Sequence, residues 1–268
     1  MYSEQIIFGK TGRKIGRLGI AANYGLDAKS IEVAFEHGCN YLLFGSMVKG
    51  YSDEMAKAIN NIVASGKRDA LFISAITFWH NNFLHRISIR KALKKINTDY
   101  LDAVILGLYN SKPGDKVLND LIKLKEKGII KYIGLSTHNR KLIPQLLKLN
   151  FFDVFHIRYN AIHKGAEIDI FPYLQDIDVN ERPGIVVFTA TAHKKLIIHS
   201  NFSEGFEIPS PADCYRFVLK NPFVNVVMTA PSNYNQLIEN LKILEEPTID
   251  EEKYLKMRKL GDLIYKGK

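Results

Sequence analysis

Cysteine is scarce in this sequence, and its scarcity excludes two classes of protein. The chain has 268 residues and only two cysteines, Cys39 and Cys214, which lie far apart in apolar stretches. This spacing supports neither a disulfide framework nor a cysteine-rich zinc site. We expect both residues to be buried free thiols in a reducing compartment.

Long apolar runs and blocks of like charge are also absent. No run approaches the roughly 20 residues that span a bilayer, and residues 1–14 contain no apolar core of signal-peptide length. These absences predict a soluble, cytoplasmic protein that does not bind membranes. No pair of His, Asp or Glu has metal-ligand spacing on one helix, so we expect no metal site.

Positive charge is in excess, with 37 Lys and Arg against 28 Asp and Glu. The excess is spread along the chain, which indicates no nucleic-acid-binding arm. We interpret it as a solvated basic surface. The alternative is a field that attracts an anionic cofactor or substrate.

Short apolar segments rich in β-branched residues alternate with amphipathic ones. The predicted strands are 18–21, 41–44, 70–74, 102–106, 132–135, 154–157, 185–188 and 224–227. Their near-uniform apolarity is typical of a parallel sheet covered on both faces. Eight such units without a linker predict a single α/β domain, residues 1–268, folded as a (β/α)8 TIM barrel. An N-terminal hairpin within 5–15 and a C-terminal outer helix over 250–264 complete this prediction.

Several short motifs occur in one order along the chain. They are Phe8–Gly12 with Arg17–Gly19, Glu36–Tyr41, Gly128–Ser136, Tyr159–Asn160, and Ser232 through Gln236 to Asn240. The ordered set resembles the aldo-keto reductase superfamily over nearly the whole chain. The resemblance implies a barrel that binds NADP(H), with NAD as an alternative, and reduces carbonyl groups by hydride transfer.

The same resemblance marks four departures. Where the family has its catalytic Asp, Tyr, Lys and His, this chain has Leu43, Val48, Ile76 and Gly107. Carbonyl reduction needs a proton donor or electrophile at the developing alkoxide, and none of these four side chains supplies one. The alternative is a register slip that brings Tyr51 or Lys49 to the place of Val48. The sequence therefore predicts a divergent branch in which the catalytic tetrad is missing.

This chain matches the family better at the cofactor-binding positions than at the four catalytic positions. By resemblance, Ser136 holds the nicotinamide carboxamide, and Phe188 replaces the tyrosine on which the nicotinamide ring stacks. The residues that the resemblance assigns to the cofactor are Ser136, Thr137, His156, Asn160, Phe188, Ser232, Asn233, Gln236 and Asn240. The last four open a helix whose N-terminal amides suit a 2′-phosphate, although helix capping alone also explains Ser232.

A cluster of titratable residues follows the sixth predicted strand. It contains Arg158, Tyr159, His163 and Glu167. We expect Arg158 to clamp an anionic substrate while His163 or Tyr159 donates a proton. The structural alternative is a simple Arg158–Glu167 ion pair. His138, after the fifth strand, is a further catalytic candidate.

Other polar and aromatic residues are weaker candidates. Trp79–Asn82 is expected to form a loop wall over the pocket, and Ser46 to replace a lost polar group. We expect His193, with Lys194 and Lys195, either to contact a cofactor phosphate or to lie in a solvated loop. His37 and His85 lie on helical stretches and are predicted to be surface residues.

Three functions follow from these observations. The leading hypothesis is an NADP(H)-binding oxidoreductase that acts on a small, anionic carbonyl substrate through a rearranged active site. The second is a catalytically inactive dinucleotide-binding sensor or partner protein. The third is a cofactor-free lyase or isomerase on the same barrel.

Overall fold

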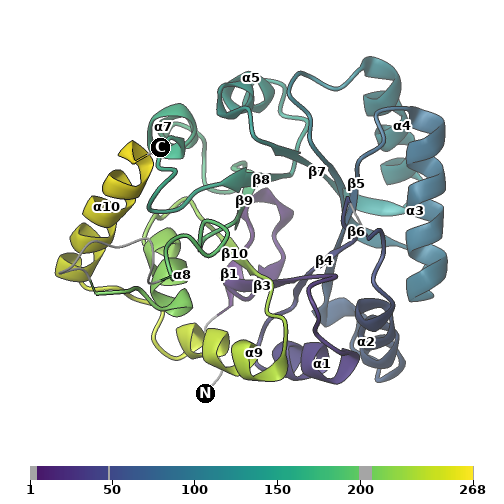
Figure 1. Cartoon of the computed structure of the whole chain (residues 1–268). Coiled ribbons are helices and arrows are strands. Elements are labelled where there is room, and N and C mark those ends of the chain that lie inside the picture. The colour runs from purple at the N-terminus through teal and green to yellow at the C-terminus, as the bar shows by residue number, and fades with distance from the viewer. Residues whose placement is uncertain (1–4, 48, 199–206, 268) are drawn as a thin grey trace.

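Eight parallel strands close into a barrel in the order β10-β3-β4-β5-β6-β7-β8-β9 (Figure 1). The strands are β3 (Leu18–Ala21), β4 (Tyr41–Phe44), β5 (Phe72–Thr77), β6 (Leu101–Leu106), β7 (Ile130–Thr137), β8 (Val154–Arg158), β9 (Gly184–Phe188) and β10 (Val226–Thr229). This computed structural model describes residues 5–47, 49–198 and 207–267. It confirms the predicted (β/α)8 barrel.

Helices surround the barrel (Figure 1). They are α1 (Ala28–Glu36), α2 (Asp53–Ala64), α3 (Asn82–Ile96), α4 (Asp115–Glu126), α5 (Ile143–Leu147), α6 (Ala166–Asp169), α7 (Phe171–Gln175), α8 (Pro211–Leu219), α9 (Tyr234–Leu241) and α10 (Glu251–Lys266). Helix α3 begins at Asn82, because the side chain of Asn81 caps it by accepting a hydrogen bond from Phe83 N at 2.9 Å.

The N-terminal hairpin closes the bottom of the barrel, as predicted. Its strands β1 (Ile6–Ile7) and β2 (Lys14–Ile15) pair antiparallel. Between them, Phe8 is fully buried, with its ring edge-on to Tyr41 and Phe72 at centroid distances of 5.6 and 5.3 Å. The hairpin thus supplies the lowest layer of the barrel interior.

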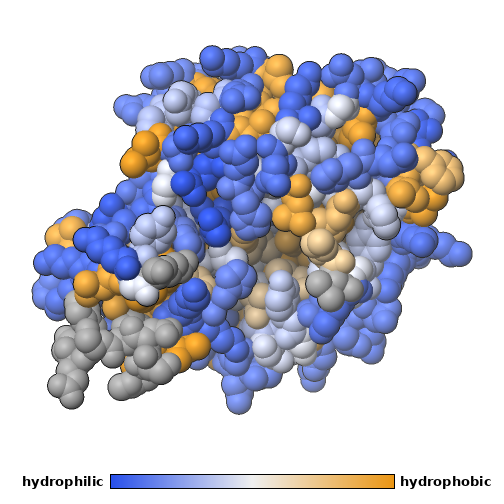
Figure 2. Space-filling model, turned by 45° about the horizontal axis from the view of Figure 1, so that its top comes forward, coloured by the Kyte–Doolittle hydropathy of each residue, from blue (hydrophilic) through white to orange (hydrophobic). Residues whose placement is uncertain are grey.

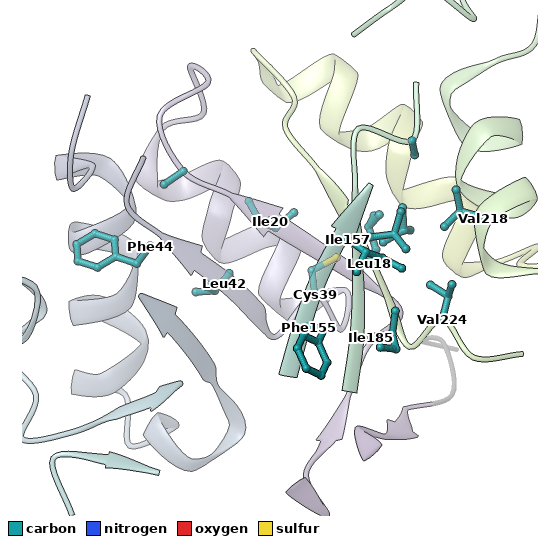
Figure 3. Packing of buried hydrophobic residues seen from close by; sticks show 14 of the residues in the cluster. Leu18, Ile20, Cys39, Leu42, Phe44, Phe155, Ile157, Ile185, Val218 and Val224 are labelled. Atoms are coloured by element: carbon teal, nitrogen blue, oxygen red, sulfur yellow. The ribbon is translucent and has the colours of Figure 1, made fainter. Parts of the chain in front are cut away.

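A second apolar layer fills the space between the strands and the helices. Figure 3 shows part of it, with Leu18 on β3, Ile157 on β8 and Val218 on helix α8. Cys39 and Cys214 both belong to this layer as free, buried thiols. Burial raises the pKa of both thiols, so neither is a ready nucleophile.

Helix α10 packs outside the barrel, beside α7 and α8 (Figure 1), which confirms the predicted outer helix. Gly261 faces the carbonyl of Ala161 so closely that a Cβ would collide with it. Lys164 Nζ donates to Asp262 Oδ1 at 2.6 Å across the same contact. The loop after β8 is therefore the docking surface for the C-terminal helix.

The prediction that His85 lies on the surface is wrong. Its side chain is 0% exposed, and neither ring nitrogen has a hydrogen-bond partner among the residues that the structure describes. The helical pattern did not reveal this because α4 covers this face of α3, with Asp120 of α4 paired to Arg86. Burial lowers the pKa of His85 to about 4, an effect opposed by the nearby Asp120 carboxylate. His37 is half-buried, with Nδ1 at 2.8 Å from Val33 O.

Candidate functional site at the barrel mouth

The C-terminal ends of the strands form the mouth of the barrel, where the chemistry of such folds is located. Figure 2 shows this face, hollowed near its middle, with both hydrophilic and hydrophobic residues around the hollow. Leu43 and Ile76 pack against the residues that fill the barrel interior and are only partly buried. They make this part of the mouth floor apolar. Val48 lies outside the described residues.

Gly107 stands at the end of β6, and an aromatic ring occupies the space beside it. A Cβ at this position would lie 2.6 Å from two ring carbons of Phe78. His80 covers the same point from above, with its ring stacked on Tyr109 at 4.0 Å and Nε2 at 3.4 Å from Gly107 O. The loop after β5 therefore fills the volume that a larger side chain at position 107 needs.

Tyr51 does not point its hydroxyl at this mouth. Its Oη lies 2.8 Å from Ser88 Oγ and donates to Ser88 O at 3.0 Å, on helix α3. Its ring stacks on Phe44 at 4.7 Å, and burial raises the pKa of its phenol. These contacts leave the register-slip alternative without support at Tyr51.

The opposite side of the mouth carries a basic and aromatic group of residues. Phe188 ends β9 beside Arg158, its register partner on β8. The ring of His138 stands edge-on to Phe188 at 5.5 Å. Burial, with smaller contributions from the charges of Arg158 and His193, lowers the pKa of His138. The imidazole is therefore neutral at pH 7, next to a permanent cation.

Ser136 and His156 are register partners one layer below. His156 is buried in the barrel interior, where its Nε2 lies 2.7 Å from Tyr41 Oη, and Tyr41 Oη donates to Ser74 Oγ at 3.1 Å. Burial lowers the pKa of His156 to about 3, so the ring stays neutral. Ser136 is nearly buried.

The predicted cluster after β8 is divided by the structure. Tyr159 is completely buried and donates from Oη to Glu167 Oε1 at 2.8 Å. The Glu167 carboxylate binds Arg258 of α10 through two hydrogen bonds of 2.6 and 2.8 Å, so it does not pair with Arg158. His163 also meets α10, edge-on to Tyr265 at 6.2 Å. These three residues contact the C-terminal helix, while Arg158 alone faces the mouth.

Three of the predicted cofactor residues form hydrogen bonds to other residues of the chain through their polar side-chain atoms. Asn160 donates to Thr189 O at 2.7 Å, and its Oδ1 accepts from two backbone N–H groups of the next turn. Asn240 is buried and donates to Thr229 Oγ1 at 2.9 Å. Thr137 Oγ1 accepts from Asn139 N at 2.9 Å. All three shape the loops and helices around the mouth.

The start of α9 is exposed, in contrast. Asn233 caps the helix by accepting from Gln236 N at 3.0 Å, and Gln236 Oε1 accepts from Ser232 N at 2.9 Å. The capping alternative given for Ser232 therefore applies to Asn233. The exposed side chains still surround a helix N-terminus.

Sequence reasoning named His193 and Lys194 in the turn after β9, but it missed the backbone conformation of this turn. Ala192, His193 and Lys194 have consecutive positive φ angles of 52°, 55° and 70°. Such angles are rare for residues other than glycine and cluster at functional sites. No glycine marks this turn in the sequence, so no local signal revealed it.

The described residues contain neither a group of side chains that could hold a metal ion nor a helix that could cross a membrane. No group of three or more His, Cys, Asp or Glu side chains in residues 5–47, 49–198 and 207–267 is placed to hold a metal ion. Within the same ranges, no helix has the length and apolarity that crossing a membrane requires.

Comparisons with known proteins point to one family. A model of the Aldo/keto reductase family matches residues 5–196. The rat aldo-keto reductase family 1 member C18 is 29% identical over 144 residues, which cover 44% of this chain and 42% of that protein. Mouse estradiol 17 beta-dehydrogenase 5 is 25% identical, over 45% of this chain and 44% of that protein. The matches span less than half the length of these curated relatives.

Solved structures share the fold at lower identity. The holo form of aldo-keto reductase AKR11C1 from Bacillus halodurans has a TM-score of 0.78 at 19% identity, over 97% of this chain and 96% of that chain. An aldo-keto reductase from Klebsiella pneumoniae in complex with NADPH has a TM-score of 0.78 at 16% identity, over 98% and 96%.

Proposed function

The chain belongs to the aldo/keto reductase family, and on this basis we propose that it binds NADP(H) at the barrel mouth and catalyses NADP(H)-dependent oxidation and reduction of a small carbonyl substrate. The observation that carries the proposal is the group formed there by Phe188, His138 and Arg158. NADPH and NADP are named with the similar Klebsiella pneumoniae barrels, and we extend that cofactor to this chain.

The residues at the mouth fit a nicotinamide ring. Phe188 is half-buried and presents an aromatic face on which such a ring stacks. Ser136 places a hydroxyl one layer below, near the end of β7. We assign stacking to Phe188 and a carboxamide contact to Ser136. His156, Asn160 and Asn240 support these residues from within the chain.

Two backbone features fit the phosphates. In the left-handed turn after β9, the N–H groups of His193 and Lys194 have no backbone acceptor among the described residues. Successive N–H groups in such a conformation form a concavity that favours anions. Ser232, Asn233 and Gln236 surround the N-terminus of α9, which also attracts a phosphate.

The residues of this chain supply the polar chemistry around the substrate carbonyl. When bound, NADPH supplies a hydride to the carbonyl carbon. The guanidinium of Arg158 stabilises the negative charge that develops on the carbonyl oxygen. Protonated His138 gives its proton to that oxygen and is reprotonated by solvent. Tyr159 takes no part, because burial and the Glu167 carboxylate raise its pKa.

Titration with NADPH tests the cofactor site. We expect saturable binding, observed as a change in the fluorescence of Trp79, the only tryptophan of the chain. Phe188→Ala removes the stacking surface and is expected to weaken binding by about threefold to tenfold. Tyr173→Ala, an exposed aromatic residue on α7, is the control and leaves the affinity unchanged. No binding at millimolar NADPH contradicts the proposal and favours the cofactor-free lyase or isomerase.

Turnover tests the assigned acid and electrophile. On an aldehyde or ketone that the protein reduces, Arg158→Gln and His138→Gln are each expected to lower kcat/KM by about tenfold to a hundredfold, the value of a charge-assisted hydrogen bond. The wild-type rate rises as the pH falls through the lowered pKa of His138, below the ordinary value of 6.5. His138→Gln removes this rise. An unchanged rate in both variants rules out their assignment.

A second function has its own support. Leu43 and Ile76 are apolar, and Phe78 fills the space beside Gly107, so these three positions supply no proton donor to this side of the mouth. These residues favour a dinucleotide-binding protein without turnover. Saturable NADPH binding without reduction of any substrate in a broad carbonyl panel is the result expected for that function.

A further inference from the structure

A large cavity lies beside the mouth, between the loop after β4, the loop after β5 and helix α3. Its volume is about 890 Å³, within the range of small-molecule sites in proteins. Ile76, at the end of β5, belongs both to its wall and to the residues that pack on the barrel interior. The cavity therefore borders the site described above.

More of the surface of this cavity is apolar than polar. Met47, Trp79 and Leu84 contribute to it, and their side chains are 66%, 52% and 36% exposed. Ile76, Phe78 and Ile87 also belong to the apolar part. Large apolar side chains gathered at a concave surface mark a place where a ligand excludes water.

The charged groups of the wall have one sign. Lys49, Lys91 and Lys95 line the cavity, and none of the described residues in its wall is Asp or Glu. Lys95 is held by Asp53 at 2.6 Å and donates to Tyr51 O at 2.7 Å. Among the described residues, Lys49 and Lys91 form no ion pair. Two uncompensated ammonium groups therefore face a hollow with apolar walls, an arrangement that concentrates anions.

We propose that this cavity binds a small organic anion with an apolar or aromatic body, and that this anion is the substrate class of the site. The apolar body contacts Trp79 and Met47, and the anionic group lies against Lys91 and Lys49. The assignment as substrate rests on the proposed function, since it needs the cofactor site at the adjoining mouth. Under this proposal, part of the chain's excess of positive charge serves to bind the ligand.

Trp79 makes the cavity directly observable, because it is the only tryptophan and lies in the wall. The experiment titrates the cofactor-free protein with phenylacetate, with phenyl phosphate and with the neutral phenylacetamide, following fluorescence and heat. We expect at least one of the two anions to bind about tenfold or more tightly than the amide. The preferred anion distinguishes a carboxylate from a phosphate ligand.

Two variants locate the anionic group. Lys91→Gln is expected to weaken binding of the preferred anion about threefold to tenfold and to leave phenylacetamide binding unchanged. Lys94→Gln is the matched control, because Lys94 is exposed on the same helix but does not line the cavity. Equal melting temperatures of the two variants establish that both are folded.

Three results would overturn the inference. They are equal affinity for the anions and the amide, equal anion affinity of Lys91→Gln and wild type, and no binding of either anion at millimolar concentration. Because the titration contains no cofactor, it is independent of the NADPH experiment. Anion binding without NADPH binding contradicts the proposed function and the substrate role, and leaves the anion site itself supported.

Discussion

Asp102→Ala is expected to lower the free energy of unfolding by about 3–5 kcal/mol, the usual cost of removing one partner from a buried ion pair. Asp102 is 0% exposed at the bottom of the barrel. Its carboxylate accepts from Arg13 at 3.1 Å, from Arg68 at 2.8 Å and from Ile73 N at 3.0 Å. Alanine leaves two part-buried guanidinium groups and one buried N–H without this acceptor.

Denaturant unfolding of matched variants measures this loss. Asp102→Asn keeps an oxygen acceptor of the same shape and is expected to lose roughly half as much. Asp115→Ala removes an exposed carboxylate whose partner Lys112 is also exposed, and costs about 1 kcal/mol or less. Similar losses for Asp102→Ala and Asp115→Ala would show that the buried network contributes little.

Acid is expected to destabilise the fold well before most carboxylates are protonated. Burial lowers the pKa of His85 to about 4 and of His156 to about 3. As the pH falls below the ordinary value of 6.5, the unfolded chain takes up a proton on each histidine and the folded chain does not. Each histidine therefore removes about 1.4 kcal/mol of stability per pH unit, so the two together remove about 4 kcal/mol by about pH 5. Above pH 6.5 their effect vanishes.

Variants separate the two contributions. His85→Leu replaces the buried ring with an apolar side chain and is expected to halve the slope of unfolding free energy between about pH 6.5 and 5. The double variant His85→Leu, His156→Gln flattens it. Denaturant unfolding at a series of pH values checks both. A wild-type profile that is already flat in this range would contradict the buried, neutral state of the two rings.

The sequence was sufficient for the family and for the barrel. Strands such as 18–21 and 41–44 are observed at their predicted bounds, because a strand covered on both faces is apolar along its whole length. The resemblance to aldo-keto reductases is confirmed by the match over residues 5–196. Both features depend on patterns that are local or that repeat along the chain, so a single sequence is enough to predict them.

The site was predictable only in part. His138 and Arg158 were identified from their places at strand ends and Phe188 from the family resemblance, and the structure brings them to one side of the mouth. Tyr159 and Glu167 lie closer to Arg158 in sequence than His138 and Phe188 do, yet Tyr159 donates to Glu167 and Glu167 binds Arg258. Arg258 lies 91 positions beyond Glu167, so no pattern in the sequence near Glu167 indicates this contact.

The sequence by itself determined the order of strands and helices and the end of the barrel at which polar groups gather. Only the tertiary structure decided which of those groups face the mouth. Strand register directs Arg158 toward the mouth, Arg258 of α10 binds Glu167, and α4 covers His85. The physical reason is that periodicity fixes which residues share a face, whereas the element that covers this face comes from a distant part of the chain.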